Sequence, residues 1–442
     1  MFKLSPKVTA FMELFRNNGY QIYIVGGPVR DMVLGNEVKN WDFATDATPE
    51  QMQKMLPDSF YHNTYGTVTT MIDDMPFEVT PFRKESEYSD NRHPDTIEWA
   101  KTVEEDLSRR DFSINAMAYD GNILTDIFNG QKDLENKLIV AVGESDKRFQ
   151  EDALRLLRAV RFASQLGFTI ETKTLESLKR NSQLIQNISG ERIRDEFLKI
   201  ASSDHAAEGV ILLKDSGLLK YILPEVDICF EVEQKSPNRH HIDDVGTHLV
   251  KSLAACPSKD PIVRFATLIH DIGKYKTYRK DEKTQMITFY NHEVVGTYQA
   301  KKIAERFKLS KKDTEKLIRL VQYHQFTVSE DQGDKAVRRF IREVGKEYIQ
   351  DMLDLRTADR IGSGATPTSW RHELFKKRLE EVQKEPFKVT DLKISGQDVM
   401  EVLKINPGPK VGEVLNKLFN EVIEGKLKNE RDQLLKGVNT YK

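Results

Sequence analysis

Segments typical of β-strands are confined to the first 135 or so residues of this chain. They are short runs rich in β-branched residues, bounded by Gly, Asp and Pro, at residues 22–25, 67–72 and 77–80. From about residue 136 onward, apolar residues recur at helical spacing instead. This change of pattern predicts an α+β protein in which a small α/β sheet domain is followed by helical domains.

With 442 residues, the chain is too long for a single core, and we expect roughly two to four domains. Turn-forming and polar residues cluster near residues 215–217, 236–238 and 384–386, where we expect breaks. The expected division is a head at 1–135, a helical neck at 136–215, a helical domain at 216–380 and a helical tail at 381–442.

The sequence has the features of a cytoplasmic protein without a membrane partner. It contains no apolar run of roughly 18 residues, and its first residues lack the apolar core and cleavage site of a signal peptide. Ser5 and Pro6 are instead typical of an N-cap and the first position of a helix. The two cysteines, Cys229 and Cys256, are too few for a disulfide framework or a thiolate zinc site. The sequence carries no signal for an oligomeric state.

The net charge of −2 conceals an uneven distribution of charge. Residues 71–106 carry 11 acidic and four basic side chains, whereas residues 301–320 carry eight basic and three acidic ones. Carboxylates can hold a metal ion, and a basic helical segment can neutralise nucleic-acid phosphates. The distribution is therefore consistent with a metal-dependent enzyme that acts on RNA.

Two glycines, Gly26 and Gly27, directly follow the first predicted strand, and a helix is predicted behind them. Glycines let backbone amides approach a triphosphate, a helix N-terminus favours its charge, and Arg30 can add a bidentate contact. A plain tight turn is the alternative.

Asp42 and Glu78 are carboxylates flanked by apolar residues on short predicted strands. Two acidic side chains that project from adjacent strands suit a hard divalent cation such as Mg²⁺, which retains several waters and bridges substrate phosphates. Solvent-facing residues on half-buried strands are the alternative, and the neighbouring glycine turn favours the metal site.

Residues 151–162 predict an amphipathic helix whose charged face carries Asp152, Arg155, Arg158 and Arg161. A carboxylate accepts a hydrogen bond from an exocyclic amine, and a guanidinium donates one to a ring nitrogen. An Asp152–Arg155 pair would therefore select C and A and reject U and G. A solvated face, with Asp152 paired to Arg155 three residues later, is the alternative.

Residues 22–200 resemble the class II tRNA nucleotidyltransferase family, which includes CCA-adding enzymes and poly(A) polymerases of the polymerase-β superfamily. Five motifs carry the resemblance: Gly-Gly-x-Val-Arg-Asp at 26–31, x-x-Asp-Phe-Ala-Thr at 40–45, Arg-Arg-Asp-Phe at 109–112, Glu-Asp-x-x-Arg at 151–155 and Glu-Arg-Ile at 191–193. It implies a polymerase-β-like nucleotidyltransferase head, an all-α neck that reads the incoming nucleotide, and helical domains that hold tRNA. By motif, the nucleotide-binding residues are Gly26, Gly27, Arg30, Arg110, Asp152, Arg155, Arg158 and Arg161. The carboxylates Asp42 and Glu78 are the expected catalytic metal ligands.

One residue departs from the family pattern, which has two aspartates separated by one residue. Asn40 stands at the first position, so only Asp42 remains. An asparagine offers a neutral oxygen to a metal, contributes no charge and cannot act as a base. We therefore expect reduced metal affinity or rate, and an impaired transferase is an open alternative.

A second group of metal-binding residue types lies in the helical half, where His270 and Asp271 end an apolar helix and Lys274 follows. With His248 and Asp359 they resemble the HD phosphohydrolase superfamily. The resemblance implies a metal site of His248, His270, Asp271 and Asp359, a second one completed by His292 and His324, and phosphatase or 2′,3′-cyclic phosphodiesterase activity on tRNA ends. Imidazole and carboxylate ligands suit Ni, Co, Mn or Mg. Ordinary core or surface histidines are the alternative.

The sequence predicts a template-independent, Mg²⁺-dependent enzyme that adds C and A to the 3′ end of tRNA from CTP and ATP. Residues 80–94 correspond to a loop that the family needs to accept A, and their presence disfavours an enzyme that adds only C. Two alternatives stay open: an A-adding enzyme or poly(A) polymerase, and an HD phosphohydrolase with an impaired transferase head. A basic amphipathic helix at about 413–427 would either pack or contact tRNA.

Overall fold

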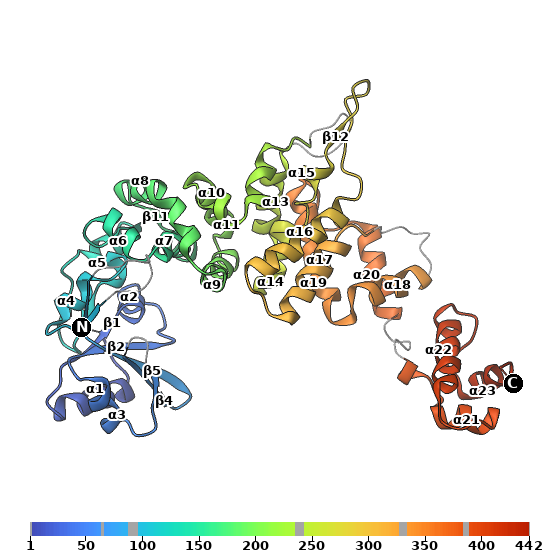
Figure 1. Cartoon of the computed structure of the whole chain (residues 1–442), viewed down its shortest axis with the longest axis horizontal. Coiled ribbons are helices and arrows are strands. Elements are labelled where there is room, and N and C mark those ends of the chain that lie inside the picture. Colours follow the sequence, from blue (N-terminus) through green and yellow to red (C-terminus); the bar gives the residue numbers. More distant parts are fainter. Residues whose placement is uncertain are drawn as a thin grey trace. The chain divides into compact units, whose positions relative to one another are not determined.

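The computed structural model describes residues 2–62, 66–86, 96–234, 243–326, 334–382 and 389–441. It is an α+β protein, as predicted, with a sheet domain in the N-terminal part and mostly helices thereafter (Figure 1). The chain divides into two compact units, Met1–Ile228 with Glu305–Leu309, and Cys229–Ala304 with Ser310–Lys442. The finer division into four domains stays a prediction.

The first unit contains a seven-stranded sheet in the order β3-β4-β5-β2-β1-β8-β9. Its strands are β1 (Ile22–Val25), β2 (Trp41–Thr45), β3 (Phe60–His62), β4 (Thr67–Ile72), β5 (Met75–Pro81), β8 (Ala118–Tyr119) and β9 (Leu124–Thr125). The neighbours β2 and β5 run parallel, and the other neighbours run antiparallel. The strands predicted at 22–25, 67–72 and 77–80 correspond to β1, β4 and β5, and the short strand predicted around Asp42 is β2.

One face of this sheet is covered by α1 (Pro6–Asn17), whose Phe11 ring lies 4.9 Å from that of Phe43 and 5.0 Å from that of Phe77. The helix begins as predicted, because the Ser5 hydroxyl accepts a hydrogen bond from the backbone N–H of Val8 and Pro6 follows it. Since side chains alternate along a strand, the neighbours of Phe43 and Phe77 point to the opposite face. Those neighbours include Asp42 and Glu78.

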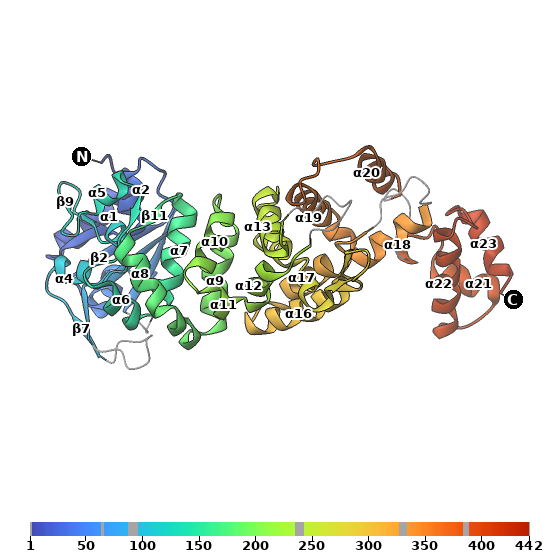
Figure 2. The ribbon, with the colours of Figure 1, turned by 90° about the horizontal axis from the view of Figure 1, so that it is seen from above.

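Helices surround the other parts of the first unit. They include α2 (Gly27–Val33), α4 (Val103–Ser108), α6 (Ser145–Glu151), α7 (Leu154–Leu166), α8 (Thr172–Asn181), α9 (Gly190–Ala201) and α10 (Ala206–Asp215). The prediction of one helix over 151–162 was wrong, because α6 ends at Glu151 and Asp152 adopts an extended conformation before α7 begins. Helix α7 packs against α9 and α10 (Figure 2).

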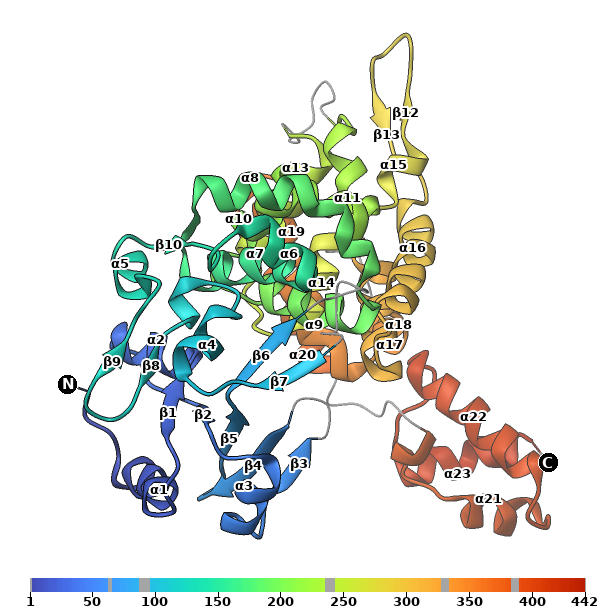
Figure 3. The ribbon, with the colours of Figure 1, turned by 60° about the vertical axis from the view of Figure 1, so that its left-hand side comes forward.

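Two short strand pairs occur where the sequence predicted almost only helix. Strands β10 (Leu138–Ile139) and β11 (Thr169–Ile170) pair in parallel, and β12 (Arg279–Lys280) pairs with β13 (Ile287–Thr288) as an antiparallel ribbon (Figure 3). A third strand pair, β6 (Arg83–Ser86) with β7 (Thr96–Trp99), begins inside the predicted loop at 80–94 and ends after it. Residues 87–95 of that loop lie outside the described residues.

The second unit is built on helices α13 (Val245–Ala255), α14 (Pro261–Ile269), α17 (Lys311–Tyr323) and α19 (Ile349–Gly362), which pack on one another. Around them lie α16 (His292–Arg306), α18 (Asp334–Val344) and α20 (Trp370–Val382). Near the C-terminus, α21 (Gly396–Leu403), α22 (Pro409–Ile423) and α23 (Arg431–Asn439) enclose a small apolar core. The helix predicted at 413–427 is α22, which begins and ends four residues earlier.

Among the described residues, none of the helices combines the length and the apolar character that crossing a bilayer requires.

Candidate functional site

A cavity of about 1000 Å³ lies in the first unit. It is lined by every residue that the sequence predicted to bind the nucleotide or Mg²⁺ in the head and neck, namely Gly26, Gly27, Arg30, Asp42, Glu78, Arg110, Asp152, Arg155, Arg158 and Arg161. These residues come from strands β2 and β5, from the turn after β1, from the end of α4 and from the α6–α7 region. The fold therefore brings the predicted residues together, and their individual roles stay predictions.

Asp42 and Glu78 are direct neighbours across the parallel pair β2 and β5. Burial raises the pKa of Asp42 to about 6, and the nearby negative charge of Glu78 adds to the effect. Two carboxylates in this arrangement repel each other unless a cation lies between them. Asn40 lines the same cavity just before β2, so its amide oxygen is available on the same side as the two carboxylates. The residues fit a divalent cation held by two charged ligands.

The glycine turn lines the same cavity as this carboxylate pair. Gly26 has a backbone φ of +71°, which L-residues rarely adopt, and a Cβ atom there would lie 2.9 Å from Arg110 Nη1. Behind it, Arg30 donates hydrogen bonds to Asp31 Oδ1 at 2.9 Å and to Asn115 Oδ1 at 3.1 Å. Backbone conformation thus favours glycine at the first position, and a side chain there would also have to displace the end of the Arg110 side chain.

Two buried aspartates, which the sequence analysis did not assign, hold the arginines of the cavity. Asp106 lies 2.6 Å from Arg109 Nη2 and 3.0 Å from Arg110 Nη2, and Asp111 lies 2.6 Å from Arg158 Nη2. Burial alone would raise the pKa of each carboxyl, but the guanidinium groups outweigh it and bring both pKa values below the ordinary range. Aspartates on either side of the Arg109-Arg110 pair were the sequence signal for this arrangement.

The predicted base-reading residues do not pair with each other through their side chains. Asp152 Oδ2 lies 2.8 Å from Arg192 Nη2 of α9. Arg155 is 8% exposed and donates to Glu151, to the backbone oxygen of Arg148 at 3.1 Å and to that of Arg109 at 2.9 Å. Because Arg155 is buried and hydrogen-bonded within the protein, the charged face predicted for residues 151–162 is not simply a solvated helix surface.

Helix α9 contributes a second partner, Glu196, which forms an ion pair with Arg161. The sequence analysis quoted the Glu191-Arg192-Ile193 motif without assigning a role to its arginine. The motif was therefore the available signal for the contact between α9 and the Asp152 region.

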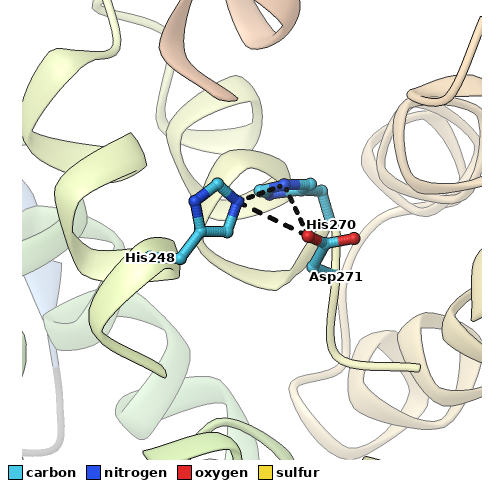
Figure 4. Close-up of side chains that lie close together, drawn as sticks. All are labelled: His248, His270 and Asp271. Carbon is cyan, nitrogen blue, oxygen red and sulfur yellow. Dashed lines mark hydrogen bonds and ion pairs between the residues drawn. The ribbon is translucent and has the colours of Figure 1, made fainter. Parts of the chain in front are cut away.

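A second cluster lies in the second unit, where six predicted residues come together from five segments. His248 is on α13, His270 and Asp271 follow α14, His292 begins α16, His324 follows α17 and Asp359 is on α19. His248 Nε2 lies 3.3 Å from His270 Nε2, 3.4 Å from Asp271 Oδ2 and 3.3 Å from Asp359 Oδ1. Figure 4 shows His248, His270 and Asp271 pointing toward one another.

The remaining two histidines approach the other oxygen of the same aspartate. Asp271 Oδ1 lies 3.1 Å from His292 Nε2 and 3.4 Å from His324 Nε2, and these two nitrogens are 3.3 Å apart. Asp271 therefore presents Oδ2 to one pair of histidines and Oδ1 to the other, which is the arrangement of a carboxylate that bridges two cations.

Backbone carbonyls set the protonation of three of these rings. The Nδ1 atoms of His270, His292 and His324 lie 2.7–2.8 Å from the backbone oxygens of Thr267, Phe289 and Val321 respectively. A carbonyl only accepts, so each Nδ1 carries the hydrogen and each neutral ring turns a lone pair at Nε2 inward. Lone pairs that face each other and a carboxylate require a cation among them, and these donors fit a metal ion.

The pKa values of residues in this cluster also indicate a site for positive charge. Burial would lower the pKa of His270, but Asp271 and Asp359 raise it to about 10. The pKa of Asp271 lies well below its usual range despite burial, because Lys274 and His270 are close to it. Burial lowers the pKa of His324, so without metal it is His270 that holds a proton in the place of a cation.

Three family models match this chain. The model described as "Poly A polymerase head domain" matches residues 22–140, that described as "Probable RNA and SrmB- binding site of polymerase A" matches residues 167–229, and that of tRNA nucleotidyltransferase domain 2 matches residues 278–438. The first two match parts of the unit that holds the large cavity, and the third covers much of the other unit.

The CCA-adding enzyme of Ligilactobacillus salivarius is 30% identical over 437 residues, which are 97% of this chain and 95% of that protein. That of Bacillus cytotoxicus is 29% identical over 447 residues, covering 98% and 97%. The crystal structure of the Bacillus stearothermophilus CCA-adding enzyme in complex with CTP superposes with a TM-score of 0.73 at 25% identity and covers 99% of this chain and 98% of its own. These full-length similarities, together with the cavity and its residues, show that the chain belongs to the CCA-adding enzyme family of tRNA nucleotidyltransferases.

Proposed function

We propose that this protein adds C and A to the 3′ end of tRNA from CTP and ATP, without a nucleic-acid template, in the cytoplasm where these substrates meet. One observation carries the proposal. Asp42 and Glu78 lie in register on adjacent strands and face the cavity that Asp152 and Arg155 also line. Metal ligands and base-reading groups thus share one cavity whose volume suits a nucleotide.

Nucleotidyltransferases of this kind use divalent metal ions. In this chain Asp42 and Glu78 would hold Mg²⁺, with a neutral oxygen offered by Asn40. A bound ion would stabilise the negative charge that develops on the phosphate and on the attacking oxygen.

The chain's own side chains would position the triphosphate. Gly26 and Gly27 allow the backbone to come close to it, and Arg30 and Arg110 provide positive charge at the same cavity. Asn115 and Asp106 hold these guanidinium groups in place. The tRNA 3′-hydroxyl oxygen would then lose its proton to water and bond to the α-phosphorus, while the bond to the β,γ-diphosphate breaks and diphosphate leaves.

Base selection would use Asp152 and Arg155. The Asp152 oxygens each accept one hydrogen bond, from Leu154 N and from Arg192, and each has a second lone pair for an exocyclic amine. The bonds from Arg155 to Glu151, Arg148 and Arg109 use three of its five N–H groups. The guanidinium is therefore held rigidly while it keeps N–H groups for a ring nitrogen.

The test offers the purified protein three tRNA transcripts, ending at the discriminator base, after one C and after two, with each nucleoside triphosphate separately. We expect C on the first two and A on the third. Addition of A alone would identify an A-adding enzyme, and runs of A would identify a poly(A) polymerase. Glu78→Gln, which removes one charge from the metal pair, should abolish all additions.

A second activity is favoured by the histidine cluster of the other unit. Its inward-facing nitrogen lone pairs fit a pair of cations, since Asp271 directs one carboxylate oxygen to each pair of histidines. Imidazole nitrogens suit a transition metal ion better than Mg²⁺. We infer a metal-dependent phosphohydrolase of the HD type that acts on phosphate at an RNA end. In such a reaction water would add its oxygen to phosphorus, and the ester oxygen would leave with a proton.

Release of inorganic phosphate, or opening of a 2′,3′-cyclic phosphate, by the Mn²⁺- or Ni²⁺-loaded protein tests this second activity. Asp271→Asn should abolish it while CCA addition continues. Loss of both activities in that variant would contradict the assignment of separate sites.

A further inference from the structure

Two neighbouring cavities lie beside the histidine cluster, and the smaller one, of about 680 Å³, is called the second cavity; it is lined by Trp370 and His372 among others. The cluster itself opens into a cavity of about 810 Å³ that contains Asp271, His292, His324 and Asp359. The two cavities share Gln325, Arg356 and Arg360 as lining residues. The two cavities are therefore neighbours, and the two arginines lie at the boundary between them.

The two arginines are fixed at this boundary by helix α19 and its following loop. Arg356 and Arg360 stand three residues before and one residue after Asp359, and Arg356 Nη1 donates to Asp359 Oδ2 at 3.2 Å. Arg360 donates to the backbone oxygens of Thr366 at 3.0 Å and Thr368 at 3.3 Å. Two oriented guanidinium groups next to a metal cluster are suited to an anionic ligand such as phosphate.

The second cavity is lined by a buried histidine, His372. His372 is 2% exposed, and its Nε2 atom is buried without a hydrogen-bond partner among the described residues. Burial lowers the pKa of this ring to about 4, so that it is neutral at pH 7 and recognises a neutral polar group. Arg356 Nε is likewise buried without such a partner. Buried polar atoms in native proteins almost always have a partner, so these two atoms indicate one that is not part of the described chain.

An aromatic ring completes the cavity. Trp370, the first residue of α20, is 61% exposed and lines the cavity beside His372. The guanidinium of Arg371 lies 5.1 Å from the centre of its ring. Exposed aromatic rings next to basic side chains are the stacking surfaces on which proteins bind unpaired bases.

We propose that this second cavity is the nucleoside subsite of the histidine–aspartate cluster, with the base stacked on Trp370 and hydrogen-bonded to His372 and the phosphate directed past Arg356 and Arg360 to the metal ligands. The ligand is a nucleoside phosphate, either free or at the end of an RNA. A phosphate ester without a base would leave Trp370 and His372 without contacts. The proposal rests on the phosphohydrolase activity inferred for the cluster.

The test compares two substrates that share one reactive group, uridine 2′,3′-cyclic phosphate and glycerol 1,2-cyclic phosphate, which lacks a base. Uridine is chosen because the Asp152–Arg155 pair would reject uracil in the other unit. In Trp370→Ala, the ratio of kcat/KM for the uridine substrate to that for the glycerol substrate should fall about tenfold. Trp370→Phe, which keeps a stacking ring, should restore most of this ratio, and His372→Phe should lower it.

Trp99→Ala is the matched control, because Trp99 is also exposed, at 48%, and lies on β7 of the first unit. An RNA that ends in a 2′,3′-cyclic phosphate forms a third substrate. A loss in Trp370→Ala with this RNA alone supports a subsite for an RNA terminus, and a loss with the mononucleotide as well supports a subsite for a single nucleoside.

Binding provides a readout that does not depend on hydrolysis. Calorimetric titration of the Mn²⁺-loaded protein with uridine 3′-monophosphate should show an affinity about tenfold weaker in Trp370→Ala than in Trp99→Ala. If no cyclic phosphate is hydrolysed but this difference persists, the phosphohydrolase assignment fails and the subsite stands. If Trp370→Ala and His372→Phe, with unchanged melting temperatures, match Trp99→Ala in both measurements, the subsite is wrong.

Discussion

Asp152 Oδ2 lies 2.8 Å from Arg192 Nη2, so an arginine of α9 holds the carboxylate that faces the nucleotide cavity. The contact joins residues 40 positions apart. It explains how a carboxylate outside both α6 and α7 can keep a defined orientation.

Asp152→Ala should disturb nucleotide choice more than triphosphate binding, because the substitution removes the acceptor for the exocyclic amine and leaves the glycine turn and Arg30 intact. We expect the preference for CTP over UTP to fall by about tenfold or more. Single-nucleotide incorporation with each triphosphate measures it. Glu144→Ala, which removes an exposed carboxylate from the segment before α7, is the control. An unchanged preference for C and A would show that Asp152 does not read the base.

Asn40→Asp should raise the rate of addition, above all at limiting Mg²⁺, because it adds a third negative ligand beside Asp42 and Glu78. Initial rates across a Mg²⁺ titration measure the effect. Asn36→Asp adds the same charge elsewhere on the cavity wall and serves as the control. An equal or lower rate in Asn40→Asp would mean that the site has adapted to the asparagine.

The histidine cluster should bind two metal ions per chain, because Asp271 presents one oxygen to each half of it. His324→Ala should lose one ion, since it removes a ligand from the Oδ1 side alone, and Asp271→Asn should lose both. Elemental analysis after dialysis measures the stoichiometry. CCA addition by both variants is the control for folding of the first unit. Two ions retained in Asp271→Asn would exclude the bridging role.

Asp106→Asn should destabilise the first unit by roughly 3 kcal/mol at neutral pH, because it leaves Arg109 and Arg110 without their buried partner. The folded-state pKa of Asp106 lies below its ordinary value. The carboxylate therefore contributes its full stability above the unfolded-state pKa of about 4 and loses it as the pH falls through the lower folded-state pKa.

Denaturant unfolding of wild type and Asp106→Asn at pH 7 and at about pH 3 checks this sign. The difference between the two proteins should shrink at the lower pH, because the wild-type carboxyl is then increasingly protonated in the unfolded state while it stays charged longer in the folded state. A difference that grows on acidification would contradict the assignment of a stabilising carboxylate.

Local features of the molecule were readable from the sequence because they depend on neighbours in the chain. The Ser5-Pro6 start of α1, the strands β1, β4 and β5, and the apolar helix that ends at Ile269 all follow from short-range patterns. The break at Asp152 was not readable in this way, since residues 151–162 have a continuous helical pattern. The extended backbone at Asp152 occurs together with the ion pair between Asp152 and Arg192 of α9, 40 residues further along the chain.

By itself, the sequence determined the motifs, the period-2 alternation that places Asp42 and Glu78 opposite the Phe43–Phe77 face, and the residues offered to metal and nucleotide. Only the tertiary structure decided their pairings: Asp42 beside Glu78 in register, Asp106 between two arginines, and Asp271 between two pairs of histidines. Strand alternation and helix caps arise from interactions over a few residues. Register and ion pairing arise from the packing of segments tens of residues apart, which the shape of the assembled core selects.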